Sequence, residues 1–116
     1  MIMKVEAFVR EEKFEDVKEA LNRIDVNGIT VSQVMGCGAQ KGSTEVVRGT
    51  KVDMMMRPKI KFEIIVSSEE WAKKTIEAIQ DAAFTGEVGD GKTFSYEVKD
   101  VIKIRTGETG IDALQD

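Results

Sequence analysis

Histidine is absent from this sequence, and cysteine and proline occur only once each. Without histidine there is no Ser-His-Asp triad, no histidine general base and none of the usual histidine-containing zinc sites. The single cysteine, Cys37, permits no disulfide bond within the chain. These absences exclude many classes of hydrolase and metalloenzyme.

Long apolar runs and aromatic residues are also scarce. No apolar stretch approaches the roughly 18 residues that a membrane-spanning helix needs, and charges interrupt the opening "MIMKVEAFVREEK" too often for a signal peptide. We therefore expect a soluble, cytoplasmic protein. The net charge of −4 argues against nucleic acid as a direct partner. An RNA-binding sheet surface would also need more aromatic residues than the 6% found here.

The remaining composition is that of one globular domain. Hydrophobic residues make up 41% of the 116 residues and charged residues 33%, which is ordinary for a soluble protein. A chain of this length buries enough surface to fold without disulfides or metals. We expect residues 1–116 to form a single domain.

Alternating apolar residues predict the strands. The predicted strands are 3–9, 29–35, 59–66 and 93–98, with a short strand or extension at 101–105. The side chains expected to share one face of their strand are Met3, Val5, Ala7, Val9, Ile29, Val31, Met35, Ile60, Phe62, Ile64, Val66, Phe94, Tyr96 and Val98.

Apolar residues at helical spacing predict two helices, at 12–25 and 67–84. Gly28 stands where the first helix should have its C-terminal cap, and Ser67 with Glu70 has the spacing of a capping box. The expected apolar stripes are Phe14, Val17, Leu21 and Ile24 on the first helix, and Ala72, Ile76, Ile79 and Ala83 on the second.

The order of these elements predicts the fold class. Strand, helix and strand are followed by a long loop and then by a second strand, helix and strand. This is the βαββαβ order of a ferredoxin-like α+β fold, with an antiparallel sheet and both helices on one face.

Residues 86–93, "GEVGDGKT", match the P-loop pattern G-x-x-x-x-G-K-[ST] at every position. A P-loop needs a buried strand before it and a helix directly after the lysine, so that backbone N–H groups at the helix N-terminus point at the phosphates. Here the predicted order is reversed, with a helix before the motif and a strand after it. This order disfavours an ATPase or a kinase.

The composition of this turn nevertheless suits an anion. Gly86, Gly89 and Gly91 can adopt positive φ and expose backbone N–H groups, and Lys92 adds a positive charge. From the residues alone, a phosphate-binding turn and a plain turn with a solvated lysine are equally open. Thr93, which completes the P-loop pattern, is expected to be an exposed β-branched strand residue.

A long loop is predicted for residues 37–57, "CGAQKGSTEVVRGTKVDMMMR", which carry three glycines and no sustained periodicity. Loops of this length are usually functional. The alternative is a long β-hairpin with a solvated tip. Met54, Met55 and Met56 suit either an adaptable partner-binding surface or packing against the body.

Three motifs combine with this fold order: "GCGAQKGSTEVVRG" at 36–49, "TGEVGDGKTF" at 85–94 and "IRTGETG" at 104–110. Together they resemble the PII nitrogen-regulatory signal-transduction proteins over essentially the whole chain. The resemblance implies a non-catalytic homotrimer that binds ATP or ADP between its subunits and engages partners through a T-loop, here about 37–57. The implied partner is a nitrogen-metabolism enzyme, a transcription factor or an ammonium channel, and only the channel would bring the protein to a membrane.

The same resemblance assigns the nucleotide site. The turn at 85–92 would hold the phosphates, and Lys103 and Arg105, from the C-terminal segment 101–116, would reach them across the subunit boundary. If residues 101–105 form a strand, these two side chains alternate onto one face and can enter one cleft. The implied nucleotide-binding residues are Thr30, Gly36, Cys37, Gly38, Glu63, Ile64, Gly89, Asp90, Gly91, Lys92, Lys103 and Arg105.

A second implied ligand is 2-oxoglutarate, which a Mg²⁺ ion joins to the ATP phosphates. Gln40 matches the metal ligand of the family, and Lys59 matches the lysine that pairs with the oxoacid. Mg²⁺ takes oxygen ligands and commonly few from protein beside substrate phosphates, so one glutamine suits it. The implied 2-oxoglutarate-binding residues are Gly38, Gln40, Lys41, Gly42 and Lys59.

Four positions, including Thr93, depart from the family pattern. Val52 and Val47 stand where tyrosines are usual, so we expect no uridylylation there and control by ligand binding alone. Ala39 stands where an arginine is common in the family. Because that arginine is missing, the alternative that this chain senses another small molecule stays open. The residues expected to contact a partner protein are Thr44, Arg48, Met54, Met55 and Met56.

The implied mechanism is a population shift in which different ligands favour different T-loop conformations, only one of which fits the partner. The remaining alternatives are sensing of another small molecule and, as an enzyme, a small ATPase that uses "GEVGDGKT". A sensor predicts slow or no ATP hydrolysis, whereas an ATPase predicts turnover well above background.

Overall fold

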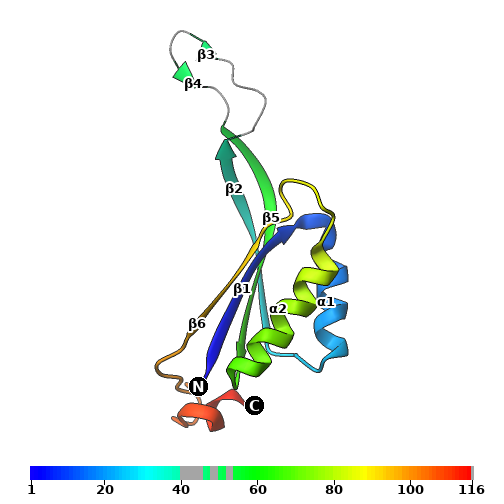
Figure 1. Ribbon diagram of the computed structural model, residues 1–116. Coiled ribbons are helices and arrows are strands. Elements are labelled where there is room, and N and C mark those ends of the chain that lie inside the picture. Colours follow the sequence, from blue (N-terminus) through cyan, green and yellow to red (C-terminus); the bar gives the residue numbers. More distant parts are fainter. Residues whose placement is uncertain (40–45, 48–49, 52–53, 116) are drawn as a thin grey trace.

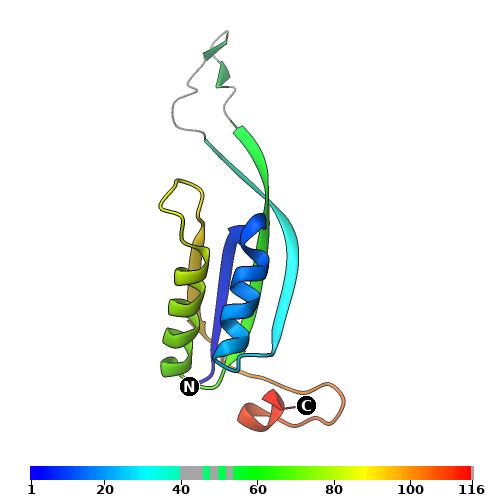
Figure 2. The same cartoon turned by 90° about the vertical axis from the view of Figure 1, so that its right-hand side faces the viewer.

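The computed structural model describes residues 1–39, 46–47, 50–51 and 54–115. Four strands form one antiparallel sheet in the order β2-β5-β1-β6, and two helices cover one of its faces (Figures 1 and 2). The elements of this body are β1 (Met3–Arg10), α1 (Phe14–Arg23), β2 (Ile29–Ala39), β5 (Met54–Val66), α2 (Glu69–Ala83) and β6 (Lys92–Glu97). The predicted ferredoxin-like βαββαβ fold is confirmed.

Smaller elements complete the description. Two short strands, β3 (Val46–Val47) and β4 (Thr50–Lys51), pair with each other at the far end of the T-loop (Figure 1). Short 3-10 helices lie at Glu11–Lys13 and at Gly110–Leu114. Among the described residues, none of the helices is long and apolar enough to cross a membrane.

The core lies between the helices and the two central strands. Alternate residues of β1 are buried, as predicted, because only one face of the sheet is covered. On β5 the predicted core residues are buried too, and Phe62 is fully enclosed, with its ring stacked on Phe14 at 5.8 Å between centroids. Burying a side chain of this size contributes about 1.5–3 kcal/mol. The buried hydrophobic residues are Met3, Val5, Ala7, Val9, Val17, Leu21, Val26, Ile60, Phe62, Ile64, Val66, Ala72, Ile79 and Ala83.

The end of α1 differs from the prediction. Asp25, not Gly28, takes the left-handed conformation after the helix, with φ of 61°. Val26 N–H then donates to the Leu21 carbonyl at 3.0 Å, and Asp25 N–H donates to the Asn22 carbonyl at 3.0 Å. These two bonds satisfy carbonyls that the helix end would leave unpaired, and aspartate tolerates the left-handed region better than most residues.

The start of α2 is displaced by one residue from the prediction. Ser68, not Ser67, is the N-cap, and its hydroxyl accepts a hydrogen bond from Trp71 N–H at 3.1 Å. Ser68 is extended, with φ of −157°, which is the conformation that lets an N-cap side chain turn back toward the third helical N–H. The helix also buries Thr75, whose hydroxyl donates to the Trp71 carbonyl at 2.7 Å.

The segment predicted as a loop at 37–57 is partly strand. β2 and β5 continue their pairing beyond the helices to the pair Ala39 and Met54, and so form a two-stranded arm (Figure 1). The hairpin alternative therefore describes the base of this segment. The pairing escaped detection because it rests on backbone hydrogen bonds, while "GCGA" and "MMM" carry no polar–apolar alternation.

Residues 101–105 do not form a strand of the sheet. Ile102 makes an isolated bridge with Thr109, and Lys103 N–H donates to the Glu108 carbonyl at 2.8 Å. The chain turns back at Gly107, whose φ is 76°. The predicted alternation of Lys103 and Arg105 along a strand is therefore wrong, because local hydrogen bonds close a turn there instead.

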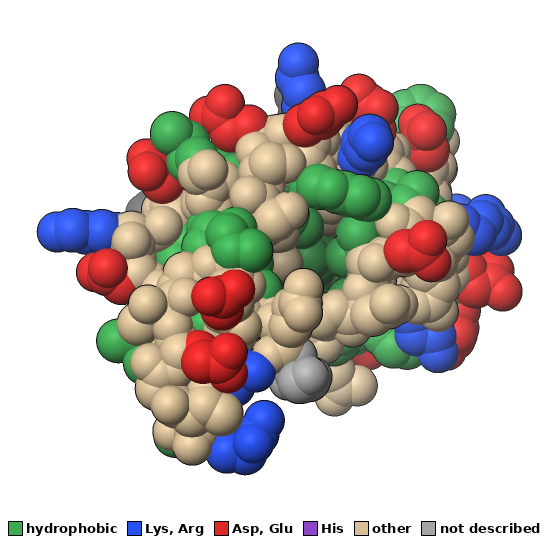
Figure 3. Space-filling view, turned by 90° about the horizontal axis from the view of Figure 1, so that it is seen from below, with side chains coloured by type: hydrophobic (Ala, Val, Ile, Leu, Met, Phe, Trp, Pro, Cys, Tyr) green, Lys and Arg blue, Asp and Glu red, His purple; other side chains and the backbone are tan. Residues whose placement is uncertain are grey.

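Both termini lie at the end of the body opposite the arm (Figure 1). Figure 3 views this end and shows hydrophobic side chains lining a hollow at its centre, with charged side chains around it. The C-terminal segment contributes strongly exposed apolar residues: Ile102 is 65% exposed and Ile104 is fully exposed.

Candidate functional site

The glycine-rich turn at residues 85–91 connects α2 to β6 at the end of the sheet from which the arm projects (Figure 1). A helix precedes it and a strand follows it, so no helix N-terminus points at a ligand held there. The structure thus confirms that "GEVGDGKT" is not a P-loop. A ligand at this turn would contact the backbone of the turn and the side chains around it.

All three glycines of the motif have the positive φ that was predicted, at 87° for Gly86, 105° for Gly89 and 99° for Gly91. Gly91 also makes a close approach, because a Cβ built on it would lie 1.7 Å from the Phe8 carbonyl oxygen. No other residue fits there without moving β1. The turn is therefore shaped by its glycines, which take positive φ and place no side chain over their own backbone.

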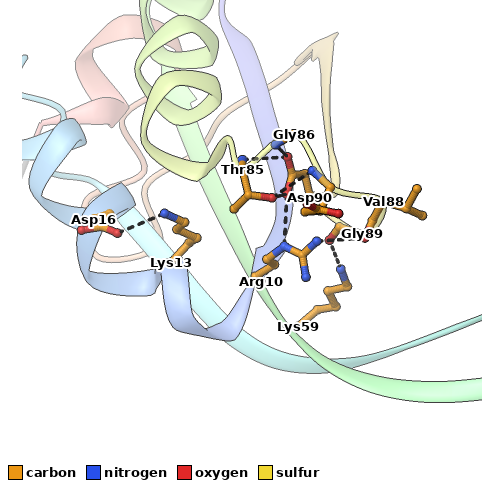
Figure 4. Close-up of polar contacts among 10 residues, drawn as sticks. Arg10, Lys13, Asp16, Lys59, Thr85, Gly86, Val88, Gly89 and Asp90 are labelled. Carbon is orange, nitrogen blue, oxygen red and sulfur yellow. Dashed lines mark hydrogen bonds and ion pairs between the residues drawn. The ribbon is translucent and has the colours of Figure 1, made fainter.

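Asp90 holds the turn together from within (Figure 4). Its carboxylate accepts hydrogen bonds from Thr85 N–H at 2.8 Å, Gly86 N–H at 2.9 Å and the Thr85 hydroxyl. Arg10 Nε adds an ion pair at 3.1 Å. The hydrogen bonds from Thr85, with those from Gly86 and Arg10, hold the pKa of Asp90 well below its usual range. This carboxylate is thus committed to the turn itself and keeps little acceptor capacity for a ligand.

Two cations bracket the turn from the sheet side (Figure 4). Arg10 on β1 and Lys59 on β5 are direct partners in the strand register. Arg10 donates to the Val88 carbonyl at 2.8 Å, and Lys59 donates to the Gly89 carbonyl at 2.5 Å. Burial lowers the pKa of Lys59, and the nearby charges of Arg10 and Arg57 lower it further. An anion placed here would relieve that repulsion.

Sequence reasoning predicted Lys59 but missed Arg10. The signal was present, since Arg10 is the last residue of β1 and lies on the opposite parity from the buried Val9. Only the register of β1 and β5 shows that it lies beside Lys59. With Lys92 at the start of β6, the end of the sheet carries three basic residues around a glycine turn, an arrangement that can bind phosphate or carboxylate groups.

Thr93 differs from its prediction. It pairs with Ala7 in the register and so faces the helices, where it is half-buried rather than exposed. It lines a cavity of about 310 Å³ behind the turn. The other lining residues are Phe8, Val9, Gln80, Ala83, Phe84, Asp90, Gly91 and Lys92.

Comparison with known proteins identifies the family. The model of the family "Nitrogen regulatory protein P-II" matches residues 2–108. The P-II protein of Rhizobium meliloti (strain 1021) is 48% identical over 111 residues, which cover 96% of this chain and 98% of the relative. The P-II 1 protein of Methanothermobacter thermautotrophicus is 49% identical over 111 residues, which cover 96% of each protein. The chain belongs to the P-II family.

Solved P-II structures resemble the fold closely. The GlnK structure of B. subtilis matches with a TM-score of 0.80 at 41% identity, covering 97% of both chains. A second structure, described as a B. subtilis GlnK–ATP complex, matches with a TM-score of 0.77 at 37% identity over 97% of this chain and 96% of that one. The sheet order and the helix placement of this chain are thus those of the P-II family.

The P-II site residues expected at the adenine fall together on the sheet. Thr30 on β2 and Glu63 on β5 are direct partners in the register, on the face away from the helices. Ile64 is fully buried in the core, so only its backbone is available to a ligand. The Glu63 carboxylate is already paired with Lys4 at 2.8 Å.

Lys103 and Arg105 are not brought to the turn within one chain. β6 runs from Lys92, opposite Phe8, to Glu97, opposite Met3, so the residues that follow lie at the other end of the sheet (Figure 1). Lys103 pairs there with Glu108 at 3.5 Å.

The arm carries other residues that the sequence predicts to contact ligands or a partner. Gly36, Cys37 and Gly38 lie on β2, paired with Arg57, Met56 and Met55 of β5, and Met54 pairs with Ala39. Cys37 is a free, exposed thiol, and the Met56 side chain is 62% exposed. The residues that lie outside the described part of the chain are Gln40, Lys41, Gly42, Thr44, Arg48 and Val52.

Proposed function

We propose that this P-II chain is a non-catalytic sensor of ATP or ADP and of 2-oxoglutarate, acting in the cytoplasm through its T-loop. The observation that carries the proposal is the turn at 85–91, shaped by three positive-φ glycines and bracketed by Arg10 and Lys59. Membership of the P-II family and the likeness to a GlnK–ATP complex support it.

The phosphates of the nucleotide would lie against Gly89, Gly91 and Lys92. Backbone N–H groups and one ammonium suit a polyphosphate. The arrangement lacks the strand–loop–helix order that P-loop enzymes use. The expectation is therefore nucleotide binding without appreciable turnover.

Lys103 and Arg105 serve this site only if a second copy supplies them. They lie at the end of the sheet opposite the turn, so one chain cannot bring both groups to the same phosphate. A homotrimer, in which each nucleotide lies between two subunits, resolves this separation. The exposed Ile102 and Ile104 of the same segment would be covered in such an assembly.

The 2-oxoglutarate site would adjoin the phosphates at the base of the arm. Lys59, with Arg10 beside it, supplies positive charge for a dicarboxylate. β2 pairs Val34 with Lys59 and ends five residues further along at Ala39. Gln40, the Mg²⁺ ligand that the family pattern implies, would therefore have to be brought back toward Lys59 when the ligand binds. When bound, the ion would link ligand oxygens through its preference for oxygen donors.

Ligand binding would act on the T-loop, which begins on β2 and returns on β5. Both strands of the arm continue directly into the sheet positions that carry Thr30, Glu63 and Lys59. The T-loop would then bind an ammonium channel, a nitrogen-metabolism enzyme or a transcription factor in only one ligand state. Val52 leaves no tyrosine for uridylylation at that position.

Calorimetry tests this function directly. ATP with Mg²⁺ is titrated into the protein, followed by 2-oxoglutarate with and without nucleotide, and the mass in solution is measured in parallel. We expect heat from ATP, heat from 2-oxoglutarate only when Mg-ATP is present, and the mass of a trimer. If 2-oxoglutarate gives no heat under any of these conditions, it is not a ligand of this protein, and a sensor of another small molecule is favoured.

A further inference from the structure

Three exposed sulfur-containing side chains lie on neighbouring positions of the arm. Cys37 of β2 and Met56 of β5 are direct partners in the register, and Met35 precedes Cys37 by two residues on the same strand. Cys37 is a free, exposed thiol, while Met35 is 55% exposed and Met56 is 62% exposed. One thiol and two thioethers are thus open to solvent on two paired strands.

All three side chains belong to the face of the sheet that carries the helices. Val31, on β2, lies opposite the buried Phe62 and so faces the helix side. Side chains two residues apart on a strand share a face, which places Met35 and Cys37 on this same face. Met56 lies there too, because it is the cross-strand partner of Cys37. The arm extends beyond both helices (Figure 2), so neither helix packs on the three sulfur atoms.

Strand geometry brings these sulfur atoms within reach of one ion. Side chains directly opposite each other have Cβ atoms about 4.5–5.5 Å apart, diagonal neighbours lie about 7–8 Å apart, and residues two apart on one strand about 6.6 Å. Methionine is unbranched and has three rotatable bonds, so its sulfur can turn toward a shared point. Bonds between a metal and sulfur are about 2.3 Å long. A single ion between the two strands can therefore contact all three sulfur atoms.

Sulfur donors select a particular class of metal ion. Thiolate and thioether ligands favour Cu(I), whereas carboxylate and water ligands favour Mg²⁺. The chain has no histidine, and within its described part no group of three or more cysteine, aspartate or glutamate side chains could hold a metal ion. The ligands that the arm offers are thus those of a soft, monovalent ion.

We propose that Cys37, Met35 and Met56 form a binding site for one Cu(I) ion at the base of the T-loop. Binding forms a Cu–S bond at Cys37, breaks the S–H bond of that thiol and releases the proton to water, with no change of oxidation state. The thiolate cancels the charge of the ion, and the two thioethers complete a neutral centre with three sulfur ligands. The ion would join β2 to β5.

This site is separate from the proposed nucleotide and 2-oxoglutarate sites. Lys59 pairs with Val34, which is one residue out of phase with Met35, so the lysine side chain lies on the opposite face of the two strands. A nucleotide contact through the backbone of Cys37 would leave its thiol on the helix side. The inference therefore goes beyond the proposed function and does not rest on it.

Variants of the full chain test each sulfur ligand. Cys37→Ser, Met35→Leu and Met56→Leu each remove one sulfur atom and nearly conserve the volume of an exposed side chain. Met55→Leu is the matched control, because Met55 pairs with Gly38 and is one position out of phase with Met56. Affinity for Cu(I) is measured under anaerobic conditions by competition with the chelator bathocuproine disulfonate.

We expect the parent to bind one Cu(I) per chain, with only sulfur neighbours in X-ray absorption at the copper edge. Cys37→Ser should abolish binding. Each of Met35→Leu and Met56→Leu should lower the affinity at least about tenfold, since losing even an outer partner of a metal ligand costs that much. Met55→Leu should match the parent.

Three results would overturn the inference. The first is a parent that retains no stoichiometric Cu(I) against the chelator. The second is a Cys37→Ser variant that binds as the parent does. The third is parental affinity in both Met35→Leu and Met56→Leu, which would mean that the thiol binds the ion alone and that the arm carries no built site.

Discussion

Arg10 and Lys59 lie directly opposite each other across β1 and β5, and each donates a hydrogen bond to a carbonyl of the turn at 85–91. Two adjacent strands thus present neighbouring positive charges to one glycine-rich turn. Like charges side by side weaken a sheet, so this pair is a cost to the isolated chain. An anionic ligand between the turn and the strands would offset that cost.

Lys92→Ala should weaken ATP binding by about tenfold or more, because a hydrogen bond to a charged group is worth roughly 1.5–3 kcal/mol. Titration calorimetry with Mg-ATP measures the change. Lys99→Ala, at an exposed position just after β6, is the control and should bind as the parent does. Equal affinity of the parent and the Lys92 variant would show that the turn does not hold the phosphates.

Gly91→Ala should destabilise the fold by about 3 kcal/mol or more, since the new Cβ meets the Phe8 carbonyl and the backbone φ is positive. Gly107→Ala provides a matched comparison, because its φ is also positive but a Cβ there meets nothing within 4 Å. That variant should lose only about 1 kcal/mol. Urea denaturation gives both values, and similar losses would argue against the close approach to β1.

Lys59→Met should reduce 2-oxoglutarate affinity by about tenfold or more while it leaves ATP binding largely intact. Arg10→Met should also weaken 2-oxoglutarate binding, but in addition it loosens the turn, because Arg10 pairs with Asp90 and with the Val88 carbonyl. Calorimetry in the presence of Mg-ATP separates the two variants. If 2-oxoglutarate binds both variants as it binds the parent, these cations do not serve the oxoacid.

Asp90 should stabilise the fold in a pH-dependent way. Its folded pKa lies well below the value of about 3.9 for an unfolded aspartate, so its contribution is present above about pH 4 and is lost as pH falls through the folded pKa. Asp90→Asn should therefore be less stable than the parent at pH 7, with a gap that narrows under acid. Thermal unfolding from pH 7 to pH 2 measures the gap. Asp81→Asn, at an exposed site on α2, should show no such trend.

The order of elements along the chain shows why the exact match to the P-loop pattern is a false one. "GEVGDGKT" contains the right residues for a P-loop, but α2 ends at Ala83 before it and β6 begins at Lys92. Periodicity alone gave that order, because the apolar stripe of a helix and the alternation of a strand are local properties. The order of apolar patterns along the chain is therefore enough to exclude a P-loop at this motif.

Features that depend on backbone hydrogen bonds were harder to predict. The pairing of Cys37 with Met56 in the arm needs no apolar pattern, and the turn at Gly107 replaces a strand that alternation suggested. The cap positions also shifted, from Gly28 to Asp25 and from Ser67 to Ser68. In each case several neighbouring residues could satisfy the same helix end, and only the local geometry selects one.

The sequence by itself determined the family, the element order and the buried face of each central strand, because these follow from motif spacing and from the period of apolar residues. Tertiary structure alone decided which distant residues meet. The register of β1 with β5 places Arg10 beside Lys59 and Glu6 beside Glu63. The register of β1 with β6 places Lys103, which follows β6, at the end of the sheet opposite the glycine-rich turn. Register is set by packing of the whole sheet against its helices, so no short stretch of sequence contains it.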